Sequence, residues 1–138
     1  MTWPTADEIQ TSLQQANGWE ARYRLLLQWA RHLTAEDLAE RSNDNYVDGC
    51  EAAVWLDYTV KSDATLYFQA DSESRLIRGL LVVLFAPLQN QTPATIANFD
   101  FNAWLTTCQL THQLTPSRTN GLYQITLRAQ ALSRSLQP

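Results

Sequence analysis

Apolar residues recur every three or four positions in several stretches of this chain, which is the spacing of one face of an α-helix. The clearest stretch places Trp19, Tyr23, Leu26, Leu27 and Ala30 on one face, with arginines between them. Several stretches begin with residues that start helices, such as Thr, Asp or a Thr-Pro pair. The pattern predicts helices over residues 5–16, 19–32, 34–41, 73–88, 100–108 and 115–136, the fourth of them capped by the acidic stretch 71–73.

Between the third and fourth of these helices, β-branched and aromatic residues become frequent, which favours strands. Two such runs, residues 54–60 and 65–70, flank the polar turn 61–64 and predict an antiparallel hairpin. Tyr46 and Val47 predict a third, shorter strand. Helices before and after this segment indicate an α+β fold with a small antiparallel three-stranded sheet. A chain of 138 residues suits a single domain, residues 1–138.

The charge balance argues against a nucleic-acid-binding role. Ten Lys and Arg residues are outnumbered by fourteen Asp and Glu residues, and the sequence has no dense basic run. The longest apolar stretch, residues 80–88, is far shorter than the roughly 20 residues of a membrane span. The polar beginning of the chain does not resemble a secretory signal. We therefore expect a cytoplasmic protein without a membrane segment, whose two cysteines stay reduced.

Cys50 is the residue whose surroundings most suggest chemistry. It stands in the stretch "NYVDGCEAAVW" at 45–55, directly after a polar loop and directly before an apolar run. Gly49 permits a sharp turn just before the thiol, which suits a presented side chain. Free cysteines are nevertheless among the most buried residues. The residues alone therefore leave both a packing role and a chemical role open.

The charges nearest to Cys50 in sequence are unfavourable for reactivity. Asp48 and Glu51 flank the thiol, and nearby negative charge disfavours the reactive thiolate. Arg118 lies in the first turn of a predicted helix, where a cation opposes the helix dipole, so its position indicates a functional or network role. The residues that could supply positive charge, by type alone, are Arg75, Arg78 and Arg118.

The other polar or reactive residues give weaker signals. Cys108 lies in an apolar-periodic stretch without a turn residue, which predicts a packed structural cysteine. His32 and His112 have no metal-ligand spacing to each other or to Cys50, so we expect no metal site. Gly79 interrupts a helical apolar run, where it lowers helix stability, and predicts close packing onto a neighbouring helix.

Five sequence blocks occur in a characteristic order and spacing. They are "WEARYRLLLQWARHL" at 19–33, "GCEAAVWL" at 49–56, "DSESRLIRGLLVVL" at 71–84, "TPATIANFDFNAWL" at 92–105 and "LTPSRTNGL" at 114–122. In these blocks the chain resembles the SufE-type sulfur acceptors, a family that includes the related CsdE proteins. The resemblance implies a small antiparallel sheet packed with helices, a fold shared with the IscU-type iron–sulfur scaffolds.

The resemblance also implies roles for individual residues. Cys50 falls on the family's sulfur-accepting cysteine, and Gly49 precedes it in the same block. Arg118 falls on the arginine of the family's "SR" motif, which belongs to a partner-facing surface. Asp71 and Glu73 fall on an acidic turn near the cysteine loop of the family fold.

The implied function is that of a sulfur carrier and activator, not of an enzyme by itself. The expected partner is a cysteine desulfurase of the SufS or CsdA type, which holds the pyridoxal phosphate, so this chain is expected to need no cofactor. A SufB-type scaffold complex for iron–sulfur cluster assembly is the expected downstream acceptor. The alternatives are an IscU-like iron–sulfur scaffold, a CsdE-like relay to tRNA modification or another sulfur-using pathway, and a binding module without sulfur transfer.

Overall fold

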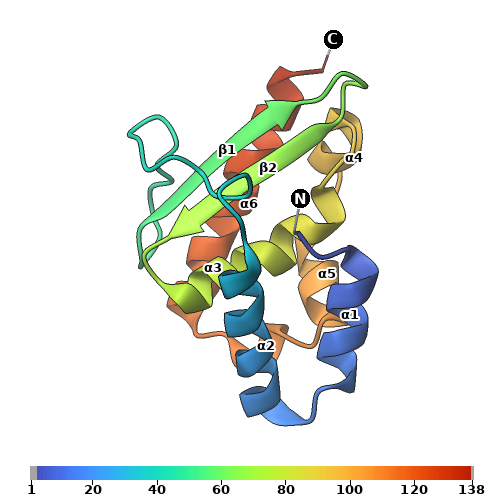
Figure 1. Ribbon diagram of the computed structural model, residues 1–138, viewed down its shortest axis with the longest axis vertical. Coiled ribbons are helices and arrows are strands. Elements are labelled where there is room, and N and C mark those ends of the chain that lie inside the picture. The colour runs from blue at the N-terminus through green and yellow to red at the C-terminus, as the bar shows by residue number, and fades with distance from the viewer. Residues whose placement is uncertain (1–2, 138) are drawn as a thin grey trace.

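The computed structural model describes residues 3–137, in which helices precede and follow one β-hairpin along the chain. Its elements are α1 (Ala6–Gln15), α2 (Gly18–His32), β1 (Val54–Val60), β2 (Leu66–Ser72), α3 (Arg75–Phe85), the 3-10 helix η1 (Ala86–Leu88), α4 (Pro93–Ala97), α5 (Phe101–Thr107), the 3-10 helix η2 (Thr111–Gln113) and α6 (Pro116–Ser135). In Figure 1, α6 runs behind the hairpin, and α3 crosses between the hairpin and the pair α1 and α2. The predicted α+β fold class is confirmed.

The sheet has two strands within the described residues, not the three that the sequence predicts. β1 and β2 pair antiparallel along their whole length. At the predicted third strand, Tyr46 makes only an isolated bridge to Trp55, next to a hydrogen bond from the Val47 N–H to the carbonyl of Val54. Pairing stops there because the chain turns at Gly49, which carries the following residues toward α6 instead of along β1.

Side-chain caps fix where most helices begin. The hydroxyl or carboxylate of the residue before each helix accepts a hydrogen bond from a backbone N–H of the first turn, an interaction that stabilises a helix start. Such caps are Thr5 for α1, Ser74 for α3, Thr92 for α4, Asp100 for α5 and Thr115 for α6. The predicted starts of the first, fifth and sixth helices are thereby confirmed.

The acidic stretch 71–73 does not cap a helix, contrary to the prediction. Asp71 and Ser72 extend β2, where Asp71 pairs with Trp55 of β1. The hydroxyl of Ser72 donates a 2.7 Å hydrogen bond to the carbonyl of Ala53, which holds the end of the strand in place. Ser74 takes over the capping role, and α3 therefore begins at Arg75.

The helix predicted over residues 34–41 is also absent, and a single turn replaces it. The carboxylate of the buried Asp37 accepts hydrogen bonds from the backbone and the hydroxyl of Thr34, both 3.1 Å long, and one of 2.6 Å from the hydroxyl of Tyr67. Its carbonyl accepts from the N–H of Ala70 in β2. A helix cannot continue here because the backbone is already bonded to the outer edge of the sheet.

The apolar run of α3 is buried, as its sequence predicts, and Gly79 sits where α3 meets α2. A Cβ placed on Gly79 would lie 2.7 Å from the carbonyl carbon of Leu26 and even closer to its oxygen. The two helix backbones therefore touch directly at this glycine. The predicted reason for a glycine in this helix is confirmed.

Gly79→Ala is expected to lower the free energy of unfolding by about 1–3 kcal/mol, because the added methyl group must push the helices apart. Urea unfolding followed by circular dichroism measures this change. Helix propensity alone would make alanine about 1 kcal/mol more stable than glycine. A more stable variant would therefore contradict the close contact between α2 and α3.

Candidate functional site

The cysteine loop, residues 44–53, leads into β1 and carries the half-buried Cys50. Gly49 has a φ of +91°, a left-handed conformation that residues with a side chain rarely adopt. This turn directs Cys50 toward α6, where its Sγ lies 3.6 Å from the carbonyl oxygen of Gly121 and donates a hydrogen bond to it. The structure thus has the sharp turn that the sequence predicts, and at rest the thiol faces a helix.

One face of α6 holds the cysteine loop along most of its length. The residues of this face are three or four positions apart, which places them on the same side of the helix. We call them the α6 stripe: Ser117, Gly121, Gln124 and Arg128. They contact successive parts of the loop, with Arg128 at the beginning of the loop and Ser117 beyond the thiol.

Arg128 binds the beginning of the loop through two backbone carbonyls. Its Nη2 donates a 2.6 Å hydrogen bond to the carbonyl of Asp44, and its Nη1 donates a 3.1 Å bond to the carbonyl of Tyr46. A planar guanidinium with several donors suits such a two-point contact better than a single ammonium group does. Because both acceptors are backbone atoms, this contact fixes the path of the chain.

The middle of the loop approaches α6 closely because glycines lie at the contact. A Cβ on Gly121 would lie 3.5 Å from the Cα and 3.9 Å from the Sγ of Cys50. One turn further along, a Cβ on Gly49 would lie 3.0 Å from the Cγ of Gln124. A side chain at Gly49 would crowd Gln124, whereas one at Gly121 would make ordinary contact with Cys50. The absence of a side chain at Gly49 is therefore what lets the loop lie this close to the helix.

The residue that follows Cys50 in the loop, Glu51, is joined to the first turn of α6 by one side-chain hydrogen bond. The hydroxyl of Ser117 donates a 3.1 Å hydrogen bond to the carboxylate of Glu51. Both side chains are exposed to solvent. This contact is therefore more easily exchanged for water than the buried contacts of the fold are.

A small cavity adjoins the thiol, and most of its lining is apolar. Its apolar walls are Ala52, Val54, Ile77, Leu122 and Ile125. Arg118, which is half-buried, lines the same cavity as Cys50. The sequence singles out Cys50 and Arg118 as candidate functional residues, although they are 68 positions apart. The structure brings them together at this cavity.

The surroundings of Cys50 favour its neutral thiol. Burial is the larger cause that raises the pKa of this thiol, and the negative charge of Asp48 raises it further. The expected effect of Asp48 is thus borne out. In this arrangement the thiol is protonated near neutral pH, and its hydrogen bond to the Gly121 carbonyl needs that proton.

Asp71 and Glu73 do not contact the thiol. Asp71 is buried and forms 3.0 Å ion pairs with the Nε atoms of Arg41 and Arg78, so Arg78 is engaged away from Cys50. Glu73 is exposed, and its N–H donates a 3.2 Å hydrogen bond to the carbonyl of Ala53. Glu73, together with the Ser72 hydroxyl, therefore holds the end of the cysteine loop at Ala53, whereas Asp71 binds two arginines and not the loop.

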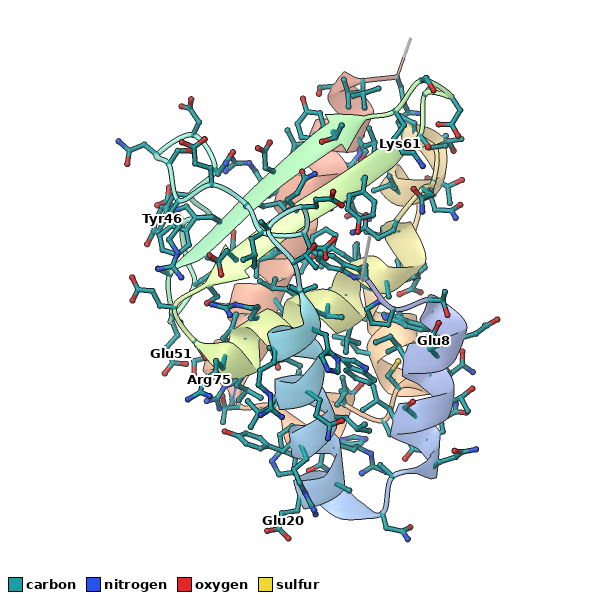
Figure 2. All side chains as sticks on the ribbon, in the orientation of Figure 1. Glu8, Glu20, Tyr46, Glu51, Lys61 and Arg75 are labelled. Carbon is teal, nitrogen blue, oxygen red and sulfur yellow. The ribbon has the colours of Figure 1, made fainter. Side chains whose placement is uncertain are left out.

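Arg75 is exposed in the first turn of α3. Figure 2 labels Arg75 on the same side of the view as Glu51. Arg75 does not line the cavity beside the thiol.

Four residues of the site escape a search for reactive side chains. They are the members of the α6 stripe, which contribute a carbonyl, an amide side chain, a hydroxyl and a guanidinium that binds backbone atoms. The signal that could have revealed them is Gly121, because a glycine inside a helix lowers helix stability and calls for a packing reason. In the structure Gly121 lies against Cys50, where a Cβ would be at ordinary van der Waals distance, 3.5 Å from the Cys50 Cα.

Cys108 is fully buried and has the environment of a packing residue, as predicted. Burial raises the pKa of its thiol to about 12, so this thiol stays protonated at neutral pH. It does not line the cavity beside Cys50. The two cysteines of the chain are therefore chemically distinct.

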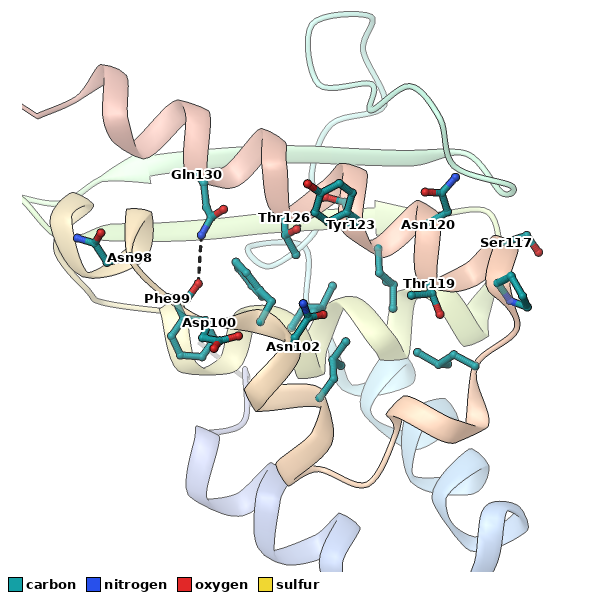
Figure 3. A pocket seen from close by; sticks show the side chains of 16 residues that line it. Asn98, Phe99, Asp100, Asn102, Ser117, Thr119, Asn120, Tyr123, Thr126 and Gln130 are labelled. Atoms are coloured by element: carbon teal, nitrogen blue, oxygen red, sulfur yellow. Dashed lines mark hydrogen bonds between the residues drawn. The ribbon is translucent and has the colours of Figure 1, made fainter.

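An open groove of about 1040 Å³ lies on the adjacent side of α6. Figure 3 shows its lining side chains, including Phe99, Tyr123 and Thr126, between α6 and the segment around α5. Gln130 closes one end with a 3.1 Å hydrogen bond to the carbonyl of Phe99. Ser117 lines both this groove and the small cavity beside Cys50, so the two hollows meet at the beginning of α6.

Comparisons with known proteins give a family and a similar fold. The sequence pattern of the SufE family, described as an Fe-S metabolism associated domain, matches residues 7–133. A solved structure described as a hypothetical protein from Thermus thermophilus is similar in fold, with a TM-score of 0.75 and 17% sequence identity. The match covers 99% of this chain and 98% of the other.

This chain belongs to the SufE family. Its role is accordingly a sulfur-related one in iron–sulfur metabolism. No helix in the described part of the chain is long and apolar enough to cross a membrane. Among residues 3–137, no three His, Cys, Asp or Glu side chains gather in a way that could hold a metal ion.

Asp48→Asn is expected to lower the pKa of Cys50, because it removes the neighbouring negative charge that raises this pKa. The rate of Cys50 alkylation by iodoacetamide near pH 7.5 should rise by about twofold, a modest effect because Asp48 is exposed and screened by salt. The pH–rate profile should move to lower pH.

The matched control is Asp44→Asn, which removes another carboxylate of the loop while leaving the carbonyl that Arg128 binds. This variant should keep the profile of the unmodified protein. An unshifted profile for Asp48→Asn would show that Asp48 does not control the thiol.

Proposed function

We propose that this protein accepts sulfur on Cys50 from a cysteine desulfurase and passes it on for iron–sulfur cluster assembly, acting in the cytoplasm. The proposal rests on the family membership and on one structural observation. The Cys50 thiol is held against α6 by its hydrogen bond to Gly121 and lines the same cavity as Arg118. Asp71, Glu73 and Gly49 would support the loop and its partner-facing surface. Pyridoxal phosphate would belong to the desulfurase.

The transfer step is an exchange at sulfur. The Cys50 thiolate, having lost its proton to solvent or to a partner group, attacks the outer sulfur of the persulfide on the desulfurase cysteine. A new bond forms between Cys50 Sγ and that sulfur, while the sulfur–sulfur bond of the desulfurase breaks. The electron pair leaves on the desulfurase thiolate, so no external oxidant or reductant is needed. A downstream acceptor, which we propose to be a SufB-type scaffold complex, then takes the sulfur from Cys50.

In the resting structure the Cys50 thiol is protonated, so docking of the desulfurase has to favour loss of its proton. Burial and Asp48 raise its pKa, whereas attack requires the thiolate. Movement of the loop away from α6 would remove the burial that is the larger cause. Arg118 already lines the cavity beside Cys50 at rest, so its positive charge is in place before docking. The loss of burial favours the thiolate only when the partner is present.

An IscU-like scaffold role has less support. Cluster assembly needs several cysteine or equivalent ligands. The chain has two cysteines, one of which is fully buried and outside the Cys50 cavity. Anaerobic reconstitution with iron and sulfide should therefore give no cluster absorption in the visible spectrum.

The unmodified protein is expected to increase alanine production from cysteine by its cognate desulfurase. Cys50→Ser should abolish this increase, because a hydroxyl cannot accept the persulfide sulfur. Cys108→Ala is the matched control: it removes the other thiol and replaces one small buried side chain with another, so stimulation should persist. Full stimulation by Cys50→Ser would contradict the carrier role.

A further inference from the structure

We propose that the Ser117–Glu51 hydrogen bond is a releasable latch on the cysteine loop, and that Arg128 is the fixed anchor about which the loop opens. This inference deepens the proposed function, because it rests on Cys50 having to leave α6 for sulfur transfer. It makes Ser117, Glu51 and Arg128 positioning residues, which act through Cys50 and do not touch the sulfur that is transferred.

The contacts on the two sides of the thiol differ in kind. On one side, Arg128 binds the carbonyls of Asp44 and Tyr46 with two hydrogen bonds, and no change of loop side chain removes those acceptors. On the other side, a single hydrogen bond joins the exposed side chains of Ser117 and Glu51. All three hydrogen bonds are exposed, but water or a partner group can replace one bond more readily than a two-point contact.

The backbone near each contact reinforces this difference. Close to Arg128, Val47 donates a 2.9 Å hydrogen bond to Val54, and Asn45 accepts a 2.8 Å bond from Leu56, so the beginning of the loop is also joined to β1. Between these bonds and the thiol stands Gly49, whose position permits a large change in backbone angles. The end of the loop is held as well, because the carbonyl of Ala53 accepts hydrogen bonds from the Ser72 hydroxyl and the Glu73 N–H. The loop therefore has two anchored ends, and between them a glycine at which it can bend and a tip held mainly by α6.

The location of Ser117 links the latch to docking. Ser117 lies in the first turn of α6 next to Arg118, and it lines both the small cavity and the large groove. A partner that covers this turn contacts the latch directly. Release of Glu51 then frees the tip of the loop while Arg128 keeps its beginning in place, which limits how far Cys50 can move and preserves its orientation.

The latch is tested by alkylation of the free protein with iodoacetamide, without a desulfurase. Ser117→Ala should increase the alkylation rate of Cys50 by about fivefold, the effect of losing one modest hydrogen bond on the opening equilibrium. Glu51→Ala removes the same bond from the other side and should give a similar increase. Glu51→Gln keeps an acceptor for the hydroxyl and should stay within about twofold of the unmodified protein.

Cys108 serves as the internal control in every sample, because it is fully buried and reacts only when the fold opens. Peptide mass spectrometry measures the two thiols separately. The latch predicts faster modification of Cys50 with Cys108 still unmodified. Equal alkylation rates of Cys50 in Ser117→Ala and in the unmodified protein would overturn the latch. Alkylation of Cys108 in parallel with Cys50 would also overturn it, because the contact would then stabilise the whole fold.

The anchor is tested by hydrogen exchange at the amide of Val47. Ser117→Ala should leave this amide protected, because only the tip of the loop is freed. Arg128→Ala should increase its exchange rate by about tenfold or more, and Arg128→Lys should recover part of the protection. Unchanged protection in Arg128→Ala would overturn the anchor. None of these results depends on sulfur transfer, so they stand apart from the Cys50→Ser experiment.

Discussion

The packing of the cysteine loop against one face of α6 is the interaction on which the rest of the site depends. The loop has little regular structure of its own, and its path is set by a guanidinium on two carbonyls, by glycines at the closest contact and by one exposed hydrogen bond. This packing makes Cys50 half-buried, gives its thiol a carbonyl acceptor and keeps its pKa raised. The proposed sulfur transfer therefore requires the cysteine loop to move away from α6.

The two cysteines differ in burial and therefore in accessibility. Cys108 lies wholly inside the core, where burial keeps it protonated and inaccessible. Cys50 lies at an edge of the core, close enough to solvent to be released and close enough to α6 to be sheltered. A resting thiol that is mostly neutral is protected from oxidation, which follows thiolate character and exposure. Such protection suits the proposed carrier role, in which Cys50 reacts with a desulfurase and then with a downstream acceptor.

Much of the fold and part of the site could be predicted from the sequence. Helical spacing and caps located most helices, Gly79 indicated close packing, and Gly49 indicated the turn before Cys50. The errors came from long-range contacts. Asp37 bonds to Tyr67 instead of starting a helix, and a strand at Tyr46 is cut short by the turn toward α6. The α6 stripe was missed because its members position the loop and carry no reactive group next to Cys50 in the sequence: Gly121 offers a carbonyl, and Arg128 binds backbone carbonyls. A search for reactive residue types cannot detect such contacts.

In the proposed transfer, sulfur resides on Cys50. Mass spectrometry of the protein after incubation with a cysteine desulfurase and cysteine, without reductant, should show a gain equal to one sulfur atom. The added sulfur should map to the peptide that contains Cys50, with the peptide of Cys108 unchanged. No gain in mass, or a gain on Cys108 alone, would rule out Cys50 as the sulfur acceptor.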